Sequence, residues 1–323
     1  MKKTVCVVGI LLAAMLLVPL SAMKKDTAPI FAAASKTEVN IPKAKDAVSD
    51  SFRVLDSASG NVTEMKSEDY IFGVVAAEMP ALYNEEALKA QSVAAYTYAC
   101  YKRAENSQKS YDISTDHTVD QSYISESAVR ERWGDKADEY AEKIKKAIRD
   151  TSGYMITCKG APILAVYHAI STGKTESAKN VWGGDYAYLK PVDSSGDLLS
   201  PNYASTVSLT AEETASKLSE ICEVSGEAAN YFGKSEKTES GNVKEISVCG
   251  KTVKGARIRS LLNLRSDAFD VKYEDGKFTF TVRGYGHGVG MSQYGADYMA
   301  KQGSDFKEIL THYYTDCTVE KVK

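Results

Sequence analysis

The stretch Gly284–Ala296, GYGHGVGMSQYGA, carries a glycine at every second position from 284 to 290. Glycine lacks a Cβ, so such a run suits backbone with positive φ and lets another group approach closely. From Phe278 to Val282 apolar and polar residues alternate, which predicts a strand. Ser292 is suited to cap a following helix. The sequence therefore predicts a strand, a glycine loop that leaves His287 uncovered, and a helix.

The residue types of this loop leave its role open. The run does not fit the dinucleotide fingerprint G-x-G-x-x-G, because positions 289 and 291 are valine and methionine. One interpretation is a ligand-binding loop around His287. The alternative is a tight structural turn with a buried, hydrogen-bonded histidine, since glycine-rich loops often serve only as turns between secondary-structure elements.

A second feature is an acid on an apolar helix face. Between Ser67 and Met79 the apolar positions follow a helical period, and Glu78 falls on the same face just before Pro80. Burial raises the pKa of a carboxyl, as a general acid requires. The alternative is a solvated or salt-bridged glutamate at a helix end. Asn84 is then expected to cap a second helix with a small-residue face.

Three separated blocks carry a family resemblance. They are the glycine loop, Gly73–Ala95 (GVVAAEMPALYNEEALKAQSVAA), and Thr175–Gly183 (TESAKNVWG) with the nearby Tyr188-Leu189-Lys190. In their order along the chain they resemble the stage II sporulation protein D family, also called amidase-enhancer-like, whose members act on peptidoglycan. The blocks frame most of residues 51–323.

The resemblance implies a lytic transglycosylase without a cofactor. Glu78 matches the glutamate of the family motif A-x-E-M-P, which is taken as catalytic. Such enzymes cleave the bond between N-acetylmuramic acid and N-acetylglucosamine as the muramyl 6-hydroxyl attacks its own anomeric carbon. Ordinary glycosidases use two carboxylates. Here one glutamate would protonate the leaving oxygen and then take the hydroxyl proton, giving a 1,6-anhydro product.

The resemblance also implies a set of substrate-binding residues. They are Ser171, Gly173, Tyr188, Lys190, His287, Ser292, Gln293 and Tyr294. Tyr188 is expected to stack on a sugar or donate to Glu78, and Lys190 to hold a muramyl carboxyl or developing negative charge. The alternatives are an exposed strand end for these two residues and a polar turn for positions 168–177.

The chain departs from the family pattern at several positions. Ala169 and Ile170 replace two hydroxyl-bearing residues, and Tyr96 stands where the family usually has arginine. Some members bind zinc through a histidine and two cysteines. Here His117 has no cysteine nearby, so the sequence predicts no metal and disfavours a metal-dependent hydrolase.

The cysteines give little information. Outside the apolar N-terminal run their number is odd and their spacing scattered, at Cys100, Cys158, Cys222, Cys249 and Cys317. There is no C-x-x-C pair, and at most two disulfides could form. Buried or free thiols are the expected state.

The N-terminus is predicted to anchor the protein. Lys2 and Lys3 precede an apolar run from Val5 to Ala22, which is long for a signal peptide and has a poor cleavage site. An uncleaved anchor over residues 1–25 with a cytoplasmic N-terminus is expected. The alternative is a cleaved secretory signal. Residues 26–50 read as a linker, and residues 51–323 as a catalytic domain with a possible lobe at 197–250.

The chain length, the net charge and the local residue patterns limit the possible folds and partners. The 323 residues carry a net charge of −3, which argues against a nucleic-acid partner. A strand is expected at Ser51–Leu55, a hairpin over 155–158 and 165–168, and helices at Thr210–Leu218 and Ala256–Leu264. Together they predict an α+β fold, with mixed helices and antiparallel strands around a glycan-binding groove.

These features predict a membrane-anchored, outward-facing enzyme that cuts glycan strands. The resemblance implies action during engulfment in sporulation, between the mother-cell and forespore membranes. The strands would already be stripped of stem peptides by a partner amidase, stage II sporulation protein P. The alternative is a non-enzymatic, glycan-binding activator of an amidase. Only the enzyme needs an acid on the apolar face, so Glu78 favours it.

Overall fold

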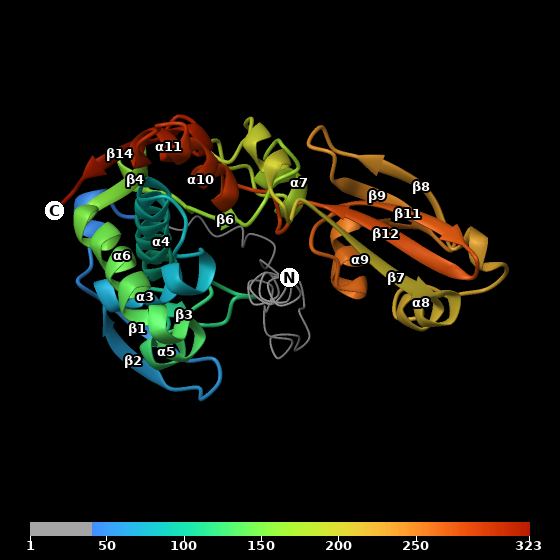
Figure 1. The fold of residues 1–323 in the computed structure, drawn as a ribbon, viewed down its shortest axis with the longest axis horizontal. Helices are drawn as coiled ribbons and strands as arrows, with labels where there is room; N and C mark the ends of the chain where they lie inside the picture. Colours follow the sequence, from blue (N-terminus) through green and yellow to red (C-terminus); the bar gives the residue numbers. More distant parts are fainter. Residues whose placement is uncertain (1–40) are drawn as a thin grey trace, which may run out of the picture.

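The computed structural model describes residues 41–323, which form a helical body and a second, strand-rich lobe (Figure 1). Both ends of the described chain lie in the body, and the lobe is an excursion between them. The predicted anchor and most of the predicted linker lie outside the described residues. None of the helices within residues 41–323 is long and apolar enough to span a membrane.

The helical body is built around α4 (Glu85–Glu105), of which thirteen residues are buried. Its neighbours are α3 (Ser67–Glu78), α6 (Ala137–Asp150), α10 (Gln293–Lys301) and α11 (Phe306–Tyr313). Alanines at 87, 90, 94 and 95 are fully buried and let these helices approach closely. The predicted cap is confirmed, because the Asn84 side chain accepts a hydrogen bond from Glu86 N.

Short strands and helices complete the body. The expected first strand is confirmed as β1 (Ser51–Leu55), which pairs antiparallel with β2 (Val62–Lys66) and parallel with β3 (Ile113–Ser114). The chain's last strand, β14 (Thr318–Lys321), pairs antiparallel with β4 (Tyr154–Cys158). The remaining elements are α2 (Ala44–Ala47), α5 (Glu126–Trp133), η2 (Gly134–Lys136), α7 (Ala178–Trp182) and η3 (Ser195–Leu199).

The predicted hairpin after β4 is wrong beyond its turn. The chain does reverse at Lys159. However, the strand that follows the turn, β5 (Ala161–Pro162), is only two residues long, and it pairs with the end of β4. The residues expected to form the second strand instead include β6 (Tyr167–His168), which pairs in parallel with β13 (Met291–Ser292). The end of the glycine loop thus supplies the strand partner, and local periodicity cannot reveal such a distant pairing.

The second lobe consists of two antiparallel three-stranded sheets and two helices. In chain order its elements are β7 (Ala204–Thr210), α8 (Ala211–Leu218), η4 (Ala228–Asn230), β8 (Phe232–Lys237), β9 (Val243–Val248), β10 (Lys251–Lys254), α9 (Gly255–Leu262), β11 (Ala268–Glu274) and β12 (Lys277–Arg283). Both helices predicted here are present. Their apolar faces and the inward residues of β12 share one core, with Leu218, Ile258 and Phe280 fully buried.

The lobe includes the strand that feeds the glycine loop. The expected lobe covered residues 197–250, whereas the lobe in the structure runs from β7 to β12. Strand β12 lies between β7 and β11, and the chain leaves it at Arg283 to re-enter the body through β13 and α10. The glycine loop is therefore a connection between the two bodies (Figure 1). The mixed α+β architecture with antiparallel sheets agrees with the prediction.

Candidate functional site

Glu78 ends helix α3 and is half-buried. Its Oε1 accepts a hydrogen bond from Ser122 N at 2.9 Å, and its Oε2 lies 3.5 Å from Gln293 Nε2. Burial raises the pKa of this carboxyl, while the bonds from Ser122 and Gln293 and the charge of His117 partly oppose the rise. A carboxyl held in this way can carry a transferable proton at a higher pH than a solvated glutamate.

A tyrosine–glutamine network lies beside Glu78. The Gln121 amide nitrogen lies 3.3 Å from the Tyr70 hydroxyl, and its oxygen accepts a 2.8 Å bond from the Tyr167 hydroxyl. Burial raises the pKa of both phenols, and the charge of Glu78 contributes to both shifts. Tyr167 is thus a neighbour of the acid that the sequence did not single out, although it directly precedes positions 168–177, which include the predicted binding residues Ser171 and Gly173.

The glycine loop has the backbone that its sequence predicts. Its four alternating glycines all have positive φ: Gly284 at 75°, Gly286 at 110°, Gly288 at 78° and Gly290 at 72°. A Cβ at Gly290 would lie 2.0 Å from Val166 O, and one at Gly286 would lie 2.8 Å from His168 Cβ. The prediction of positive φ and close approach is therefore confirmed.

His287 is less open than the flanking glycines suggested. Its Nδ1 accepts a 3.1 Å bond from Val289 N, and its ring contacts those of Trp182 and His168 at centroid distances of 5.0 and 5.8 Å. His168 in turn contacts Val289 O through Nδ1. Burial lowers the pKa of both imidazoles, that of His168 to about 4. The two rings are therefore neutral near pH 7 and help to shape the loop.

Asp197 gathers several of the predicted binding residues. This fully buried carboxylate accepts bonds from Ser171 N at 2.8 Å, Ser194 Oγ at 3.0 Å and Ser292 Oγ at 2.8 Å. Ser171 Oγ accepts a further bond from Gly173 N. Burial raises the pKa of Asp197 despite these donors. No sequence signal indicates this residue, because it lies in a stretch without a recognisable motif.

Helix α10 connects the Asp197 cluster to the acid. Ser292 caps the helix by accepting a bond from Gly295 N, and the next residue, Gln293, faces Glu78. Tyr294 lies on the rim, where its hydroxyl donates to Leu199 O at 3.2 Å and its ring meets that of Tyr83 edge-on. The first turn of α10 therefore places Ser292 against Asp197, Gln293 against Glu78 and Tyr294 at the rim.

Known proteins similar to this chain identify its family. Residues 56–158 match the family model described as stage II sporulation protein. The chain is 37% identical to stage II sporulation protein D of Bacillus subtilis (strain 168), over 82% of this chain and 77% of that protein. It is also 37% identical to the protein of the same name from Bacillus amyloliquefaciens, over 81% and 76%. The chain belongs to the stage II sporulation protein D family.

A more distant relative has a different name. The amidase enhancer of Bacillus subtilis (strain 168) is 28% identical over 76% of this chain, which corresponds to 40% of that longer protein. The matches to both names agree with the resemblance noted in the sequence, and the family is one of sporulation proteins.

Two of the predicted substrate-binding residues, Tyr188 and Lys190, make contacts away from Glu78. The Tyr188 hydroxyl accepts a 3.0 Å bond from Leu164 N, which fixes the tyrosine within the body. Lys190 is exposed, and its ammonium lies 3.6 Å from Asp316. In this structure neither makes the direct contact with Glu78 that a role in proton transfer would require.

The departures from the family pattern have structural explanations. Ile170 is buried, and its backbone exchanges hydrogen bonds of 3.0 and 2.7 Å with Tyr285 of the glycine loop. Ala169 O accepts a bond from Tyr294 N. The two positions therefore join the loops through their backbones, and loss of the side-chain hydroxyls leaves those backbone bonds in place.

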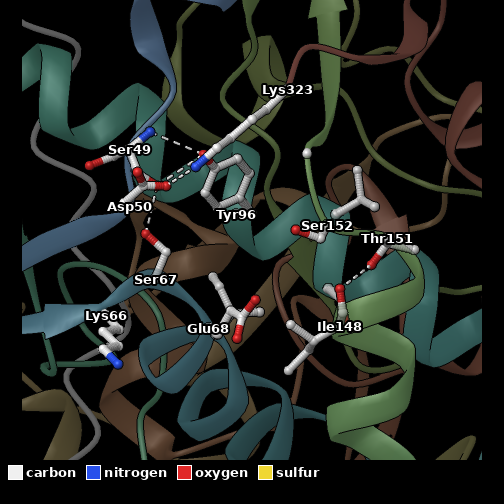
Figure 2. Close-up of a pocket in the computed structure, with 14 residues that line it drawn as sticks. Ser49, Asp50, Lys66, Ser67, Glu68, Tyr96, Ile148, Thr151, Ser152 and Lys323 are labelled. Carbon is white, nitrogen blue, oxygen red and sulfur yellow. Dashed lines mark hydrogen bonds and ion pairs between the residues drawn. The ribbon is translucent and has the colours of Figure 1, made fainter.

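Tyr96 lines a cavity of about 180 Å³ between α3, α4, α6 and the end of the chain (Figure 2). Its hydroxyl donates to Ser49 O and accepts from Ser49 N, both at 3.1 Å. Lys323 reaches across this cavity to Asp50. Tyr96 therefore secures the start of the domain, and neither Glu78 nor Gln293 lines this cavity.

Glu176 connects the loop at 172–176 to the second lobe. The side chain is almost fully buried, with four donors at 2.6 to 3.1 Å: Ser177 N, Asn180 Nδ2, Thr238 Oγ1 and Asn242 Nδ2. Its backbone N donates to Gly288 O at 2.7 Å. Within residues 41–323, no three or more His, Cys, Asp or Glu side chains are grouped so as to hold a metal ion.

Proposed function

We propose that this protein is a peptidoglycan lytic transglycosylase in which Glu78 is the general acid and then the general base. The observation that carries the proposal is the state of this carboxyl. It is half-buried, its pKa is raised, and it contacts the Ser122 N–H and the Gln293 amide, with His117 nearby. A protonated carboxyl beside an open loop system can donate to a glycosidic oxygen.

Two other carboxylates of the body, Asp197 and Asp120, are engaged in hydrogen bonds. Both oxygens of Asp197 accept bonds, from Ser171, Ser194 and Ser292. Asp120 is buried and accepts from Ser114 N and Tyr98. A hydrolase with two carboxylates would need one of these groups free to act on water or the anomeric carbon.

An intramolecular nucleophile removes that need. Glu78 protonates the leaving glycosidic oxygen, and the carboxylate then formed accepts the proton of the muramyl 6-hydroxyl as that oxygen bonds to C1. The bound sugar supplies its own nucleophile at high effective concentration. Gln293 and Ser122 N–H hold the carboxylate between the two proton transfers, and the neutral amide adds no charge that would fix it as an anion.

Groups suited to a glycan strand lie close to Gln293, the neighbour of Glu78. Tyr294 meets Tyr83 edge-on and donates to the backbone of the exposed Leu199, while Ser171 and Gln293 are themselves almost fully buried. Hydroxyls, amides and tyrosine rings are groups that bind sugars by hydrogen bonds and stacking. His287 would act through the shape of the glycine loop, while Tyr188 and Lys190 would contact more distant parts of a strand.

We further propose an outward-facing enzyme anchored by its N-terminal segment and active on peptide-free glycan strands in sporulation engulfment. The family match supports a sporulation role. The partner would be an amidase such as stage II sporulation protein P, which would supply the stripped strands. The predicted anchor supports a location between the mother-cell and forespore membranes.

The second candidate function is a non-enzymatic activator of an amidase, which the name of the amidase-enhancer relative favours. The two functions differ in one assay. Purified protein is incubated with peptide-free glycan strands, and separately with intact peptidoglycan plus an amidase. The proposed enzyme shortens the strands by itself. Intact strands, together with faster amidase release of stem peptides, would instead support the activator.

A further inference from the structure

Five cysteines lie within residues 41–323, all as free thiols. Four of them are arranged as two neighbouring pairs, one in the helical body and one in the second lobe. We propose that these pairs, Cys158 with Cys317 and Cys222 with Cys249, form disulfides in the outward-facing protein. The inference rests on the outward location proposed above, because disulfides persist in oxidising compartments.

The first pair follows from strand register. In the antiparallel ladder of β4 and β14, Thr157 lies opposite Thr318, so the next opposed positions are Cys158 and Cys317. Opposed residues in such a ladder have Cα atoms about 4.5–5.5 Å apart. Disulfides span Cα separations of about 4.4–6.8 Å. The Cys158 thiol also contributes to the raised pKa of Cys317, so the two thiols are close neighbours.

The second pair joins a helix end to a hairpin turn. Cys222 follows α8, where its backbone N donates to Leu218 O at 3.0 Å. Cys249 lies in the β9–β10 turn with φ at 47°, and its N donates to Tyr231 O at 2.8 Å. The Cys222 thiol contributes to the raised pKa of Cys249, so the two thiols are neighbours. The hydrogen bonds of Cys222 N and Cys249 N hold both backbones in place.

The oxidant would be the disulfide of a thiol–disulfide oxidoreductase. A cysteine thiolate attacks one sulfur of that disulfide, which gives a mixed disulfide and releases one thiolate of the oxidant. The second cysteine thiolate then attacks the mixed disulfide and releases the other. Each pair loses two protons and two electrons, and the oxidant gains two thiols. Burial raises the pKa of Cys249 to about 11 and of Cys317 to about 12, so uncatalysed exchange is slow near neutral pH.

The two bonds would constrain different parts of the chain. A Cys158–Cys317 bond closes a loop that contains the whole second lobe and the glycine loop, whereas a Cys222–Cys249 bond closes a short loop within the lobe. Cross-links that close longer loops remove more entropy from the unfolded chain. Cys100 is buried on α4, with Tyr96 rather than a second cysteine as its neighbour, and should stay reduced.

The test has two arms, both on the full chain. In the first, protein from the membrane fraction of a Gram-positive host is acid-quenched, alkylated and mapped by mass spectrometry without reduction. In the second, purified reduced protein is incubated with oxidised glutathione at mildly alkaline pH. We expect the two linked peptide pairs in both arms, a mass lower by four hydrogen atoms, and an alkylated Cys100. Full alkylation in both arms, or other pairings, would overturn the proposal.

Variants separate a disulfide from simple packing. Under oxidising conditions Cys158→Ser and Cys317→Ser should each lower Tm by about 10 °C, and the double variant by no more than either single one. Cys100→Ser is the control and should leave both linkages in place. Bonds that form with glutathione but are absent in the membrane fraction would refute the outward location. That result would not affect the transglycosylase chemistry, which is assayed separately on glycan strands.

Discussion

The surroundings of Glu78 and of Glu176 show two ways in which this chain uses a partly or fully buried carboxylate. Glu176 is almost fully buried and accepts four hydrogen bonds from both bodies of the molecule. Glu78 is half-buried, with one short bond from Ser122 N and one long contact with Gln293. A carboxylate held by donors from both bodies connects segments, whereas a carboxyl with a raised pKa can exchange a proton.

The largest expected effect is a loss of turnover on substitution of Glu78, which substitution of Glu176 should not reproduce. Glu78→Gln removes the transferable proton and should lower turnover on peptide-free strands by about 10²–10⁴-fold, with binding and Tm nearly unchanged. Glu176→Gln replaces one carboxylate oxygen with an amide donor, which then faces the donor Asn180 or the donor Asn242, and should cost about 1–3 kcal/mol of unfolding free energy. Steady-state rates and urea unfolding check both. Equal losses of turnover and stability in the two variants would remove the distinction.

The glycine loop allows a second comparison, within one segment. At Gly290 an added Cβ would meet Val166 O at 2.0 Å, so Gly290→Val should break the β6–β13 pairing and lower the yield of folded protein sharply. At Gly288 the nearest atom is 3.4 Å away, and only the positive φ is unfavourable. Gly288→Val should cost about 1–3 kcal/mol. Thermal unfolding distinguishes them, and the reverse order would contradict the loop geometry.

The buried ring of His168 predicts a pH effect on stability. The pKa of His168 is about 4 when folded, against 6.5 for an exposed histidine. Below pH 6.5 the unfolded chain binds a proton that the folded protein does not, so stability is full above that pH and falls toward pH 4. The loss from His168 alone is about 3 kcal/mol. His168→Asn keeps a donor for Val289 O, and its urea midpoint should depend less steeply on pH. An unchanged slope would contradict burial of a neutral ring.

The smallest expected effect concerns Lys190. Its exposed ammonium lies 3.6 Å from Asp316, and exposed ion pairs contribute about 0–1 kcal/mol. Lys190→Ala should leave Tm and the rate on short strands nearly unchanged, with a modest rise in KM on long strands. Lys179, another exposed lysine beside a carboxylate, provides the matched control variant. A loss of turnover comparable to that of Glu78→Gln would place Lys190 in the proton-transfer machinery.

The sequence predicted the parts of this site that depend on local physics. Alternating glycines required positive φ, the helical period placed Glu78 on the apolar face, and Ser292 and Asn84 matched the chemistry of helix caps. The family motif supplied Gln293, which does contact Glu78. These features each involve residues that are close in sequence, where propensity and spacing carry the information.

The features that the sequence missed depend on distant segments. Asp197 gathers Ser171 and Ser292 across the fold, and the parallel pairing of β6 with β13 replaces the expected hairpin. Tyr188 matches a family position, yet its hydroxyl is used by Leu164 N. Such contacts arise when the second lobe and α10 return to the body, and no local pattern encodes which backbone group will be nearest.

The central claim is that Glu78 directs an attack by the substrate's own hydroxyl. Mass spectrometry of the products from peptide-free glycan strands tests it most directly. Transglycosylation predicts 1,6-anhydro-muramyl ends, each one water lighter than a hydrolytic end, from the wild type and almost none from Glu78→Gln. Reducing muramyl ends from the wild type would contradict this account, because water would then be the nucleophile and a second carboxylate would be required.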